Sequence, residues 1–309
     1  MPAPICLIVN PAAGGGRAAR VAPVAERALA ARGLDVRRVD TRDLEHGRTL
    51  AAQAARAGET VVALGGDGLI GALADVLRHS PDAVLGVIPG GRGNDLARIL
   101  GIPDDAEAAA AIVAAGHRHA LDLGLVAGEA GEERAFVGIA SAGFDSDANR
   151  IANEAPAWLG GLVYVYGALR ALAAWHPTRV EIELDPPGER HSFSAFSIGA
   201  ANSRAYGGGM LAAPDAMLDD GLLEVVVMED VSKWAFLTRI LPKVFKGTHI
   251  HEPEVHVFRA RELSLSADRP FMMYADGDPI AQLPVRVRAL AGAVNVLVPA
   301  APGPAFAQS

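Results

Sequence analysis

The chain has 309 residues, and because a domain averages about 150 residues, this length predicts two domains rather than one. Of these residues 50% are hydrophobic and 21% are charged, a balance that excludes a mainly disordered protein. With 28 Lys and Arg against 36 Asp and Glu, the net charge of −8 argues against affinity based on nucleic-acid phosphates, so we expect no nucleic-acid partner.

The first 125 residues alternate between strand and helix patterns. Short apolar runs predict strands at Ile5–Val9, Val36–Val39, Thr60–Leu64 and Val84–Ile88. Helical patterns lie between these strands, and Asp104 is the expected N-cap of a further, alanine-rich helix. This alternation predicts a Rossmann-like parallel sheet with helices on both faces, in which ligands bind at the carboxyl ends of the strands.

After residue 125 the pattern changes to short strands separated by Gly, Pro and Asp. Helices are expected only at about Leu159–Trp175 and Val231–Lys246. We therefore predict an antiparallel β-sandwich domain over residues 126–293, following an α/β domain over residues 1–125. The strand candidates are Ala135–Ala140, Arg179–Leu184, Phe193–Ala200, Leu222–Val227, Glu254–Phe258, Glu262–Ser266, Phe271–Tyr274 and Val285–Val287.

Three strands of the first domain end in glycine-rich loops. These loops run from Asn10 to Gly16, from Gly65 to Gly68 and from Pro89 to Asp95. Glycine lets backbone N–H groups approach an anion closely, and a helix that follows presents its positive N-terminus. Tight turns alone would explain one such loop, but three at one edge of a sheet predict a polyphosphate site.

Asp67 lies within the second of these loops. A carboxylate beside a phosphate is repelled unless a divalent cation lies between them or the carboxylate is there to accept a proton. A magnesium nucleotide explains its position best, and the alternative is an aspartate that caps the next helix.

The loops begin a longer series of ordered motifs. Asn-Pro-x-x-Gly, Gly-Gly-Asp-Gly and Pro-x-Gly-x-x-Asn-Asp are followed by Asn202–Met210, Ala213–Leu223 and Asp276-Gly277-Asp278-Pro279. Together these motifs resemble the diacylglycerol kinase catalytic-domain family, which includes bacterial soluble lipid kinases, sphingosine kinases and ceramide kinases. The resemblance implies ATP-dependent phosphorylation of a lipid hydroxyl. It also implies a phosphofructokinase- or NAD-kinase-like plan, with ATP between an α/β domain and a β-sandwich and with a strand near Val294–Val298 returning to the first domain.

The same resemblance implies roles for individual residues. A structural Mg²⁺ would be held by the Asp220 side chain and the backbone carbonyls of Met217 and Leu222. Asp67 would engage catalytic magnesium or activate the hydroxyl, and Asp276 or Asp278 would orient or deprotonate the lipid hydroxyl. The nucleotide side would be lined by Asn10, Gly14, Thr41, Gly65, Gly66, Asp67, Gly68, Arg92 and Asn94.

Three positions depart from the family pattern. Leu69 and Arg92 stand where threonine is usual, and Asp278 stands where glutamate is usual. A base displaced by about an ångström can lose on the order of a hundredfold in rate. A lipid-binding pseudokinase is therefore one alternative and an NAD kinase-like enzyme is another, whereas an oxidoreductase is disfavoured because the first strand lacks G-x-G-x-x-G.

The sequence gives no sign of a leader peptide or of a spanning helix, and its one cysteine, Cys6, indicates a reducing compartment. We expect a cytoplasmic protein that draws its lipid from the membrane surface, with peripheral association at the inner face and a homodimer left open. Helical periodicity places Trp234, Leu237, Ile240, Leu241 and Val244 on one arc of Val231–Lys246, where packing on a core is favoured over contact with a bilayer.

Overall fold

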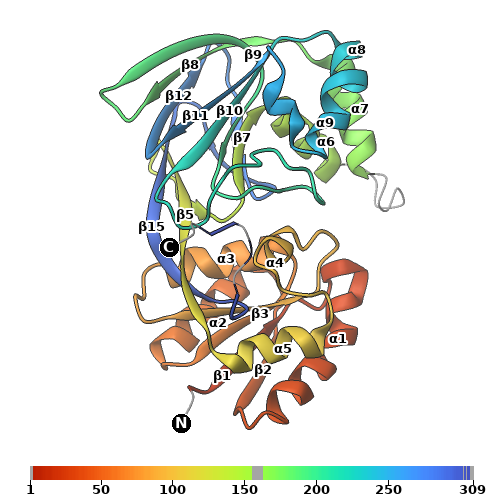
Figure 1. Ribbon diagram of the computed structural model, residues 1–309, viewed down its shortest axis with the longest axis vertical. Coiled ribbons are helices and arrows are strands. Elements are labelled where there is room, and N and C mark those ends of the chain that lie inside the picture. Colours follow the sequence, from red (N-terminus) through yellow and green to blue (C-terminus); the bar gives the residue numbers. More distant parts are fainter. Residues whose placement is uncertain (1–2, 155–162, 302, 304, 307–309) are drawn as a thin grey trace.

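The computed structural model describes residues 3–154, 163–301, 303, 305 and 306. It shows an α/β domain and a β-rich domain stacked along the long axis of the molecule, with two long strands running from one into the other (Figure 1). The fold class expected from the sequence is confirmed: the first domain has parallel strands, and the second is antiparallel.

The α/β domain contains the four predicted strands, each within two residues of its expected bounds. The strands lie in the order β4-β3-β1-β2 and all run parallel. One expected cap is wrong, because Asp105 and not Asp104 accepts the Ala108 amide at the start of α5. The elements are β1 Ile5–Val9, α1 Ala13–Ala30, β2 Val36–Asp40, α2 Leu44–Arg56, β3 Thr60–Gly65, α3 Asp67–Leu77, β4 Val84–Pro89, α4 Asp95–Ile99 and α5 Ala106–Ala115.

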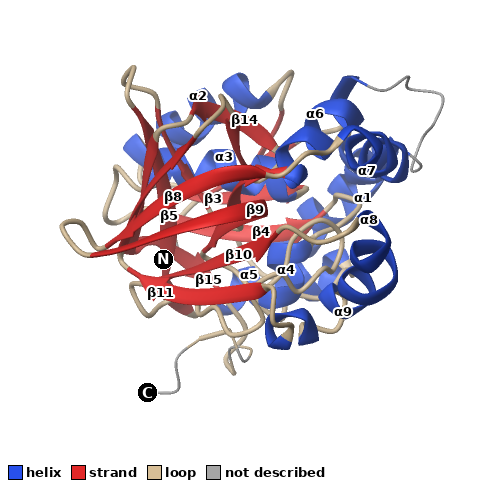
Figure 2. Ribbon diagram, turned by 90° about the horizontal axis from the view of Figure 1, so that it is seen from above, coloured by secondary structure: helices blue, strands red, loops and turns tan. Residues whose placement is uncertain are grey.

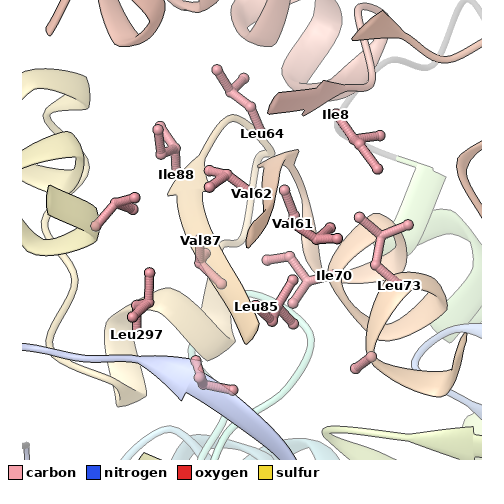
Figure 3. Packing of buried hydrophobic residues seen from close by; sticks show 14 of the residues in the cluster. Ile8, Val61, Val62, Leu64, Ile70, Leu73, Leu85, Val87, Ile88 and Leu297 are labelled. Carbon is pink, nitrogen blue, oxygen red and sulfur yellow. The ribbon is translucent and has the colours of Figure 1, made fainter. Parts of the chain in front are cut away.

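The core of this domain lies on both faces of the sheet, which is why its central strands read as continuous apolar runs. Every residue of β1 and β4 is buried. Leu64 and Ile88 lie on one face of the strands, and Ile70 and Leu73 of α3 lie beside Val61 and Leu85 on the other face (Figure 3). The rigid sheet fixes where each strand ends, and so fixes where each loop begins.

The C-terminal domain is built mainly from antiparallel strands. The predicted strand Ala135–Ala140 is two strands, β6 and β7, and of the predicted helix Leu159–Trp175 the part from Val163 is α7, while residues 155–162 lie outside the described part. The edge strand β14 was not expected, because Asp278 and Pro279 open it and proline suits only an edge. The elements are β6 Glu133–Phe136, β7 Ile139–Gly143, α6 Phe144–Glu154, α7 Val163–Ala174, β8 Thr178–Leu184, β9 Glu189–Ala201, β10 Leu223–Glu229, α8 Lys233–Ala235, the π-helix η2 Phe236–Ile240, α9 Leu241–Val244, the 3₁₀-helix η3 Thr248–His251, β11 Val255–Ala260, β12 Glu262–Ala267, β13 Met272–Ala275 and β14 Asp278–Gln282.

Two long strands join the domains into one hydrogen-bonded sheet. β5 (Arg118–Gly128) and β15 (Val285–Leu297) pair antiparallel over most of their lengths, with an irregularity between Leu290 and Val294. β15 begins beside β12 and ends parallel to β4, where Asn295 lies opposite Val84. The strand expected near residues 294–298 is therefore the last part of β15, and the expected domain boundary at residue 125 lies inside β5.

Gly124 in β5 tests this junction. A Cβ added there would lie 2.0 Å from the buried Phe136 ring, so we expect Gly124→Ala to lower the free energy of unfolding by about 1–3 kcal/mol through overpacking. The matched control is Gly199→Ala in β9, whose Cβ would meet only ordinary contacts at 3.5 and 3.8 Å. Urea denaturation of both variants measures the difference, and equal losses would contradict this account of the junction.

Candidate active site

The strand order of the α/β domain creates a crevice at the carboxyl end of its sheet. β1 has β2 on one side and β3 on the other, so the loops after β1 and β3 leave from a topological switch point. The Asn10 amide donates to the Leu64 carbonyl (3.0 Å), and the Gly90 amide donates to the Gly65 carbonyl (2.7 Å). These two hydrogen bonds hold the beginnings of all three glycine-rich loops together.

The loops approach one another so closely that only glycine fits at their contacts. A Cβ on Gly14 would lie 2.5 Å from the Gly90 carbonyl oxygen, and a Cβ on Gly91 would lie 2.5 Å from the Gly66 Cα. Gly14, Gly15 and Gly16 also have positive φ angles, which L side chains rarely adopt. Three turns that are far apart in the sequence therefore meet at one edge of the sheet, as the sequence analysis expected.

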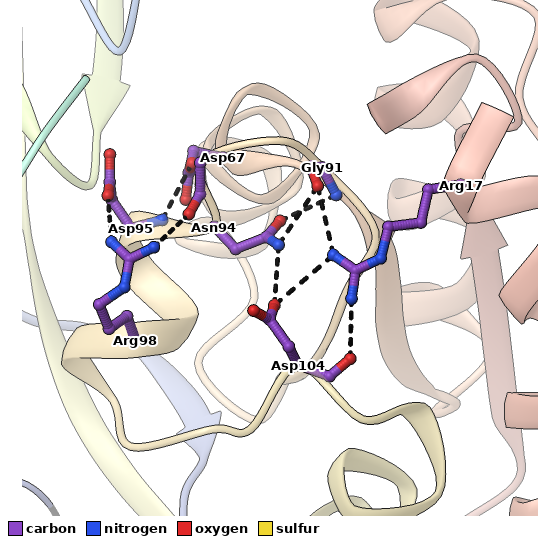
Figure 4. A network of polar contacts seen from close by, with 8 residues as sticks. Arg17, Asp67, Gly91, Asn94, Asp95, Arg98 and Asp104 are labelled. Carbon is purple, nitrogen blue, oxygen red and sulfur yellow. Dashed lines mark hydrogen bonds and ion pairs between the residues drawn. The ribbon is translucent and has the colours of Figure 1, made fainter. Parts of the chain in front are cut away.

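Asp67 is the first residue of α3 and reaches across to the next loop. Its carboxylate accepts hydrogen bonds from the amides of Asp95 (3.2 Å) and Leu96 (3.0 Å) and so caps α4, while Gly66 occupies the N-cap position of α3 (Figure 4). Burial raises the pKa of the Asp67 carboxyl, the two hydrogen bonds oppose that rise, and the nearby charge of Asp95 adds to it.

Asn94 shapes the third loop from within. It is buried, has a positive φ of 51°, and accepts the Gly91 amide through Oδ1 (2.8 Å). Its Nδ2 donates to Asp104 (3.0 Å), whose backbone carbonyl in turn accepts from Arg17 (2.9 Å) (Figure 4). The Asn94 side chain thus fixes the loop on which Arg92 stands, and Asp104 serves this network rather than the expected helix cap.

Asp276 reaches the same region from the other domain. Its carboxylate accepts the amides of Val137 (2.8 Å) and Gly138 (2.9 Å), and a Cβ on Gly71 of α3 would lie 3.0 Å from its Oδ2. Gly71 is about one helical turn beyond Asp67. Burial, and after it the charge of Asp67, raise the pKa of Asp276 to about 6 although three backbone hydrogen bonds oppose the rise. The charge of Asp67 therefore acts on the pKa of Asp276 across the domain boundary.

Asp278 lies in a different environment. Its side chain is 47% exposed on β14, and its nearest ionic partner is Arg134 at 4.0 Å. The two acids of the Asp-Gly-Asp motif are thus separated by the structure: Asp276 faces α3, and Asp278 pairs loosely with a surface arginine.

A second contact between the domains was not expected from the sequence. The Gly208 amide donates to the Asp95 carboxylate (2.7 Å), which also pairs with Arg98 (2.6 Å). Gly208 belongs to the Asn202–Met210 motif, so this motif docks directly beside the Asp67 carboxylate that caps the same helix.

The residues expected to hold structural magnesium lie in the loop before β10. Asp220 accepts the Leu222 amide (3.0 Å) and pairs with Arg259, while the Met217 sulfur accepts from Arg204. Buried Asp122, on the unexpected strand β5, accepts the amides of Gly221 (2.6 Å) and Gly292 (2.7 Å). The sequence offered one sign of Asp122, a single acidic residue within an apolar run.

Negative charge accumulates around this loop. Burial raises the pKa of Asp122, and the charges of Asp220 and Asp219 add to the rise. Burial also raises the pKa of Glu224, with Arg259 opposing and the charges of Asp215 and Asp220 adding. Within the part of the chain that the structure describes, no three His, Cys, Asp or Glu side chains form a metal-ligand group. The expected donor set needs one carboxylate and two carbonyls, and the surrounding charge suits a cation, so the residues fit this prediction.

Comparison with known proteins agrees with the geometry. Residues 4–126 match the family model of the diacylglycerol kinase catalytic domain, and residues 138–298 match the YegS C-terminal NAD kinase beta sandwich-like domain. A diacylglycerol kinase of Mycobacterium tuberculosis (strain ATCC 25618 / H37Rv) is 35% identical over 300 residues, covering 96% of this chain and 95% of the relative. The chain belongs to the diacylglycerol kinase family.

A further relative agrees with this assignment, and a solved structure shares the fold. A probable lipid kinase YegS-like protein of Stenotrophomonas maltophilia (strain K279a) is 30% identical over 78% of this chain and 79% of its own length. A crystal structure of a diacylglycerol kinase from Bacillus anthracis str. Sterne shares the fold with a TM-score of 0.75 at 21% identity, over 96% of this chain and 97% of that one.

The structure shows where the residues that depart from the family pattern lie. Leu69 belongs to the first turn of α3 and is 2% exposed. A Cβ on Gly65 would lie 2.8 Å from its Cδ2. A Cβ on Gly47 would lie between Leu69 and buried Thr41, whose amide donates to the Val9 carbonyl (2.7 Å). Leu69 is therefore a core residue here, and Thr41 lies beside it rather than free at the surface.

Arg92 and Gly68 are less closely packed than the glycines at the contacts between the loops. Arg92 is exposed, and a Cβ added to Gly68 would meet no atom within 4 Å among the described residues. Unlike Gly14 and Gly91, Gly68 is not required by the packing of the protein itself.

Gly91 tests the convergence of the loops. Because its Cβ would clash with the Gly66 backbone, we expect Gly91→Ala to lower the free energy of unfolding by about 1–3 kcal/mol. Gly68→Ala is the control and should leave stability unchanged or raise it, because alanine favours the helix by up to about 1 kcal/mol. Thermal or urea unfolding distinguishes them, and a Gly91→Ala variant as stable as the parent would refute this close contact.

Proposed function

We propose that this chain transfers the γ-phosphoryl group of Mg-ATP to the hydroxyl of diacylglycerol or a related lipid alcohol, such as a sphingoid base. The observation that carries the proposal is the meeting of three glycine-rich loops and Asp67 with Asp276 of the other domain. Family membership supports the same class of reaction.

On the nucleotide side, the protein supplies positioning and positive charge, which phosphoryl transfer needs more than covalent chemistry. The backbone amides of the loops after β1, β3 and β4 would bind phosphate oxygens. Open space at Gly68 leaves room for them beside the N-terminus of α3, and the exposed Arg92 guanidinium can add a cation where the family usually has a hydroxyl. Asn10 and Asn94 hold these loops in shape.

On the acceptor side, Asp276 is the better candidate for the base. Its pKa of about 6 leaves the carboxylate ionised at neutral pH and still able to accept a proton as the lipid hydroxyl attacks. The Val137 and Gly138 amides fix its orientation. Asp278, half exposed beside Arg134, would orient the lipid headgroup, and Asp67 would hold the catalytic cation or stay a cap.

For the structural cation, Asp220 would supply the carboxylate and Met217 and Leu222 the backbone carbonyls. Bound there, Mg²⁺ would offset the negative charge that adds to the effect of burial on the pKa of Asp122 and Glu224. The same Asp122 side chain holds Gly221 and Gly292, so this loop links the metal site to the strands between the domains.

The first test is a panel of acceptors. We expect release of ADP from ATP on adding diacylglycerol or sphingosine in mixed micelles, and no release with NAD⁺ or after chelation of Mg²⁺. Turnover of NAD⁺ alone would favour the NAD kinase-like alternative. Retention of lipid without ADP release from any acceptor would favour the pseudokinase.

The pH dependence tests the role of Asp276. Because burial raises its pKa, its carboxylate is lost by protonation as pH falls below about 6, so kcat/KM should drop tenfold per unit below that point. Asp276→Asn should lower the rate about 10²–10⁴-fold and should no longer show the fall in kcat/KM at acidic pH. Asp278→Asn is the matched control and should keep that fall. If Asp276→Asn kept it unchanged, Asp276 would be excluded as the base.

Gly68 tests where the phosphates bind. Since its surroundings are open, we expect Gly68→Ala to keep the unfolding free energy but to weaken ATP binding at least about tenfold by filling phosphate space. Isothermal titration with a non-hydrolysable ATP analogue measures this. Parental affinity in Gly68→Ala would show that the phosphates lie elsewhere.

A further inference from the structure

The helix expected at Val231–Lys246 is three short helical pieces that together run from Lys233 to Val244. Residues of α8 lead into the π-helix η2, and α9 follows with Pro242 near its start. Proline has no amide hydrogen to donate one turn back, which explains the wider hydrogen bonding of η2 before it. The segment lies with α6 and α7 on one side of the sheet in both views (Figures 1 and 2).

This segment has a buried face and an exposed apolar face. Phe236, Ile240 and Val244 are buried in the core of the second domain. Core packing was therefore the right expectation for Ile240 and Val244. It was wrong for Trp234 and Leu237, which point outward with 75% and 36% of their surface exposed. Phe245 is 54% exposed on the same segment.

Most of the large hydrophobic residues that are exposed lie on this one segment. Among the described residues, the large hydrophobic side chains exposed to this degree are Trp234, Leu237, Phe245 and Val257, and three of the four lie on this segment. A cluster of this kind, rimmed by polar residues, marks an interaction surface in a soluble domain. We call Trp234, Leu237 and Phe245, with the adjacent Lys233 and Lys246, the apolar–lysine face.

The charge of this face is opposite to that of the chain. All three lysines of the sequence, Lys233, Lys243 and Lys246, lie on or next to this helical segment. No acidic residue occurs from residue 231 to residue 251, although the whole chain carries −8. Glu252 pairs with both Lys243 and Arg239 and so offsets part of the positive charge.

The two remaining lysines flank the aromatic side chains. Lys233 is exposed next to Trp234, and its ammonium donates to the Ala173 carbonyl at the end of α7 (2.6 Å). Lys246 is exposed next to Phe245. Each exposed aromatic residue therefore has an exposed lysine as its neighbour in the sequence.

We infer that the apolar–lysine face binds the surface of an anionic lipid bilayer. Tryptophan is enriched at the level of lipid headgroups, and a lysine stem can lie along acyl chains while its ammonium meets phosphate. Protein interfaces, in contrast, are depleted in lysine, so the combination favours a bilayer over another protein. The inference rests on the proposed function, because a lipid kinase must reach its substrate in a membrane.

The face is joined to the candidate active site by a short loop. The Leu211 amide donates to the Val244 carbonyl (3.0 Å), directly behind the face. Three residues earlier, the Gly208 amide donates to Asp95 beside the phosphate loops. A bilayer bound at this face would therefore contact the same loop that closes on the α/β domain.

The test is binding of the full chain to vesicles without ATP, so its result does not depend on kinase activity. Large vesicles of phosphatidylcholine alone, and of phosphatidylcholine and phosphatidylglycerol in equal parts, are sedimented with the protein. We expect tighter binding to the anionic vesicles. Trp234→Ala should weaken binding about tenfold or more, and Lys246→Gln should weaken it about fivefold. Arg190→Gln, at an exposed arginine on β9, is the control and should leave vesicle binding unchanged.

Two variants with one added charge complete the design. Leu237 and Val257 are 36% and 37% exposed, but Val257 lies on β11. Leu237→Glu should abolish binding to anionic vesicles, and Val257→Glu should not. Equal effects of both variants, or no binding by the parent chain, would overturn the inference. A parent dimer that Leu237→Glu converts to a monomer, without vesicle binding, would also overturn it and would assign the face to a second copy of the chain.

Discussion

A contact between two backbones, those of Gly66 and Gly91, sets the geometry on which the candidate site depends. The loops after β3 and β4 can lie this close because Gly91 has no side chain: a Cβ there would lie 2.5 Å from the Gly66 Cα. Their amides then gather at the end of the sheet, together with the turn of three positive-φ glycines after β1. This is the arrangement that lets a protein bind several phosphates with few cations, and the chain is indeed acidic overall. The exposed Arg92 on the third loop is an addition to that design.

The second constraint is the shared sheet. β5 and β15 pair with each other in both domains, so the α/β part and the β-rich part have one continuous hydrogen-bonded framework. Besides this framework, the contacts between the domains include Asp276 against α3, the Gly208 amide on Asp95 and the Ala135 amide on Asp75 of α3. Burial, and after it the charge of Asp67, raise the pKa of Asp276, which is a cost unless a cation or a proton transfer uses these acids.

The sequence predicted most of the first domain because β1, β3 and β4 are almost wholly buried and are followed by glycine-rich loops. It predicted less of the second. β5 was missed since its first residues are charged and its apolar run carries Asp122, and β14 was missed because it opens with an acid and a proline. The local sequence pattern also could not show which of Asp276 and Asp278 faces α3. Only the pairing of β13 with β7 shows which of them meets α3. The exposure of Trp234 likewise depends on which face of its helix the distant core covers.

The path of β15 has a consequence for how the protein is made. The side chain of Asn295 donates to the carbonyl of Pro81, 214 residues earlier, just before β4 begins (3.0 Å). The domain that emerges first from the ribosome therefore waits for one of its edge strands until the other domain has been synthesised. Such long-range pairing slows folding and leaves a sheet edge open in the meantime, so the nascent α/β domain is the part of the molecule for which a chaperone would be most useful.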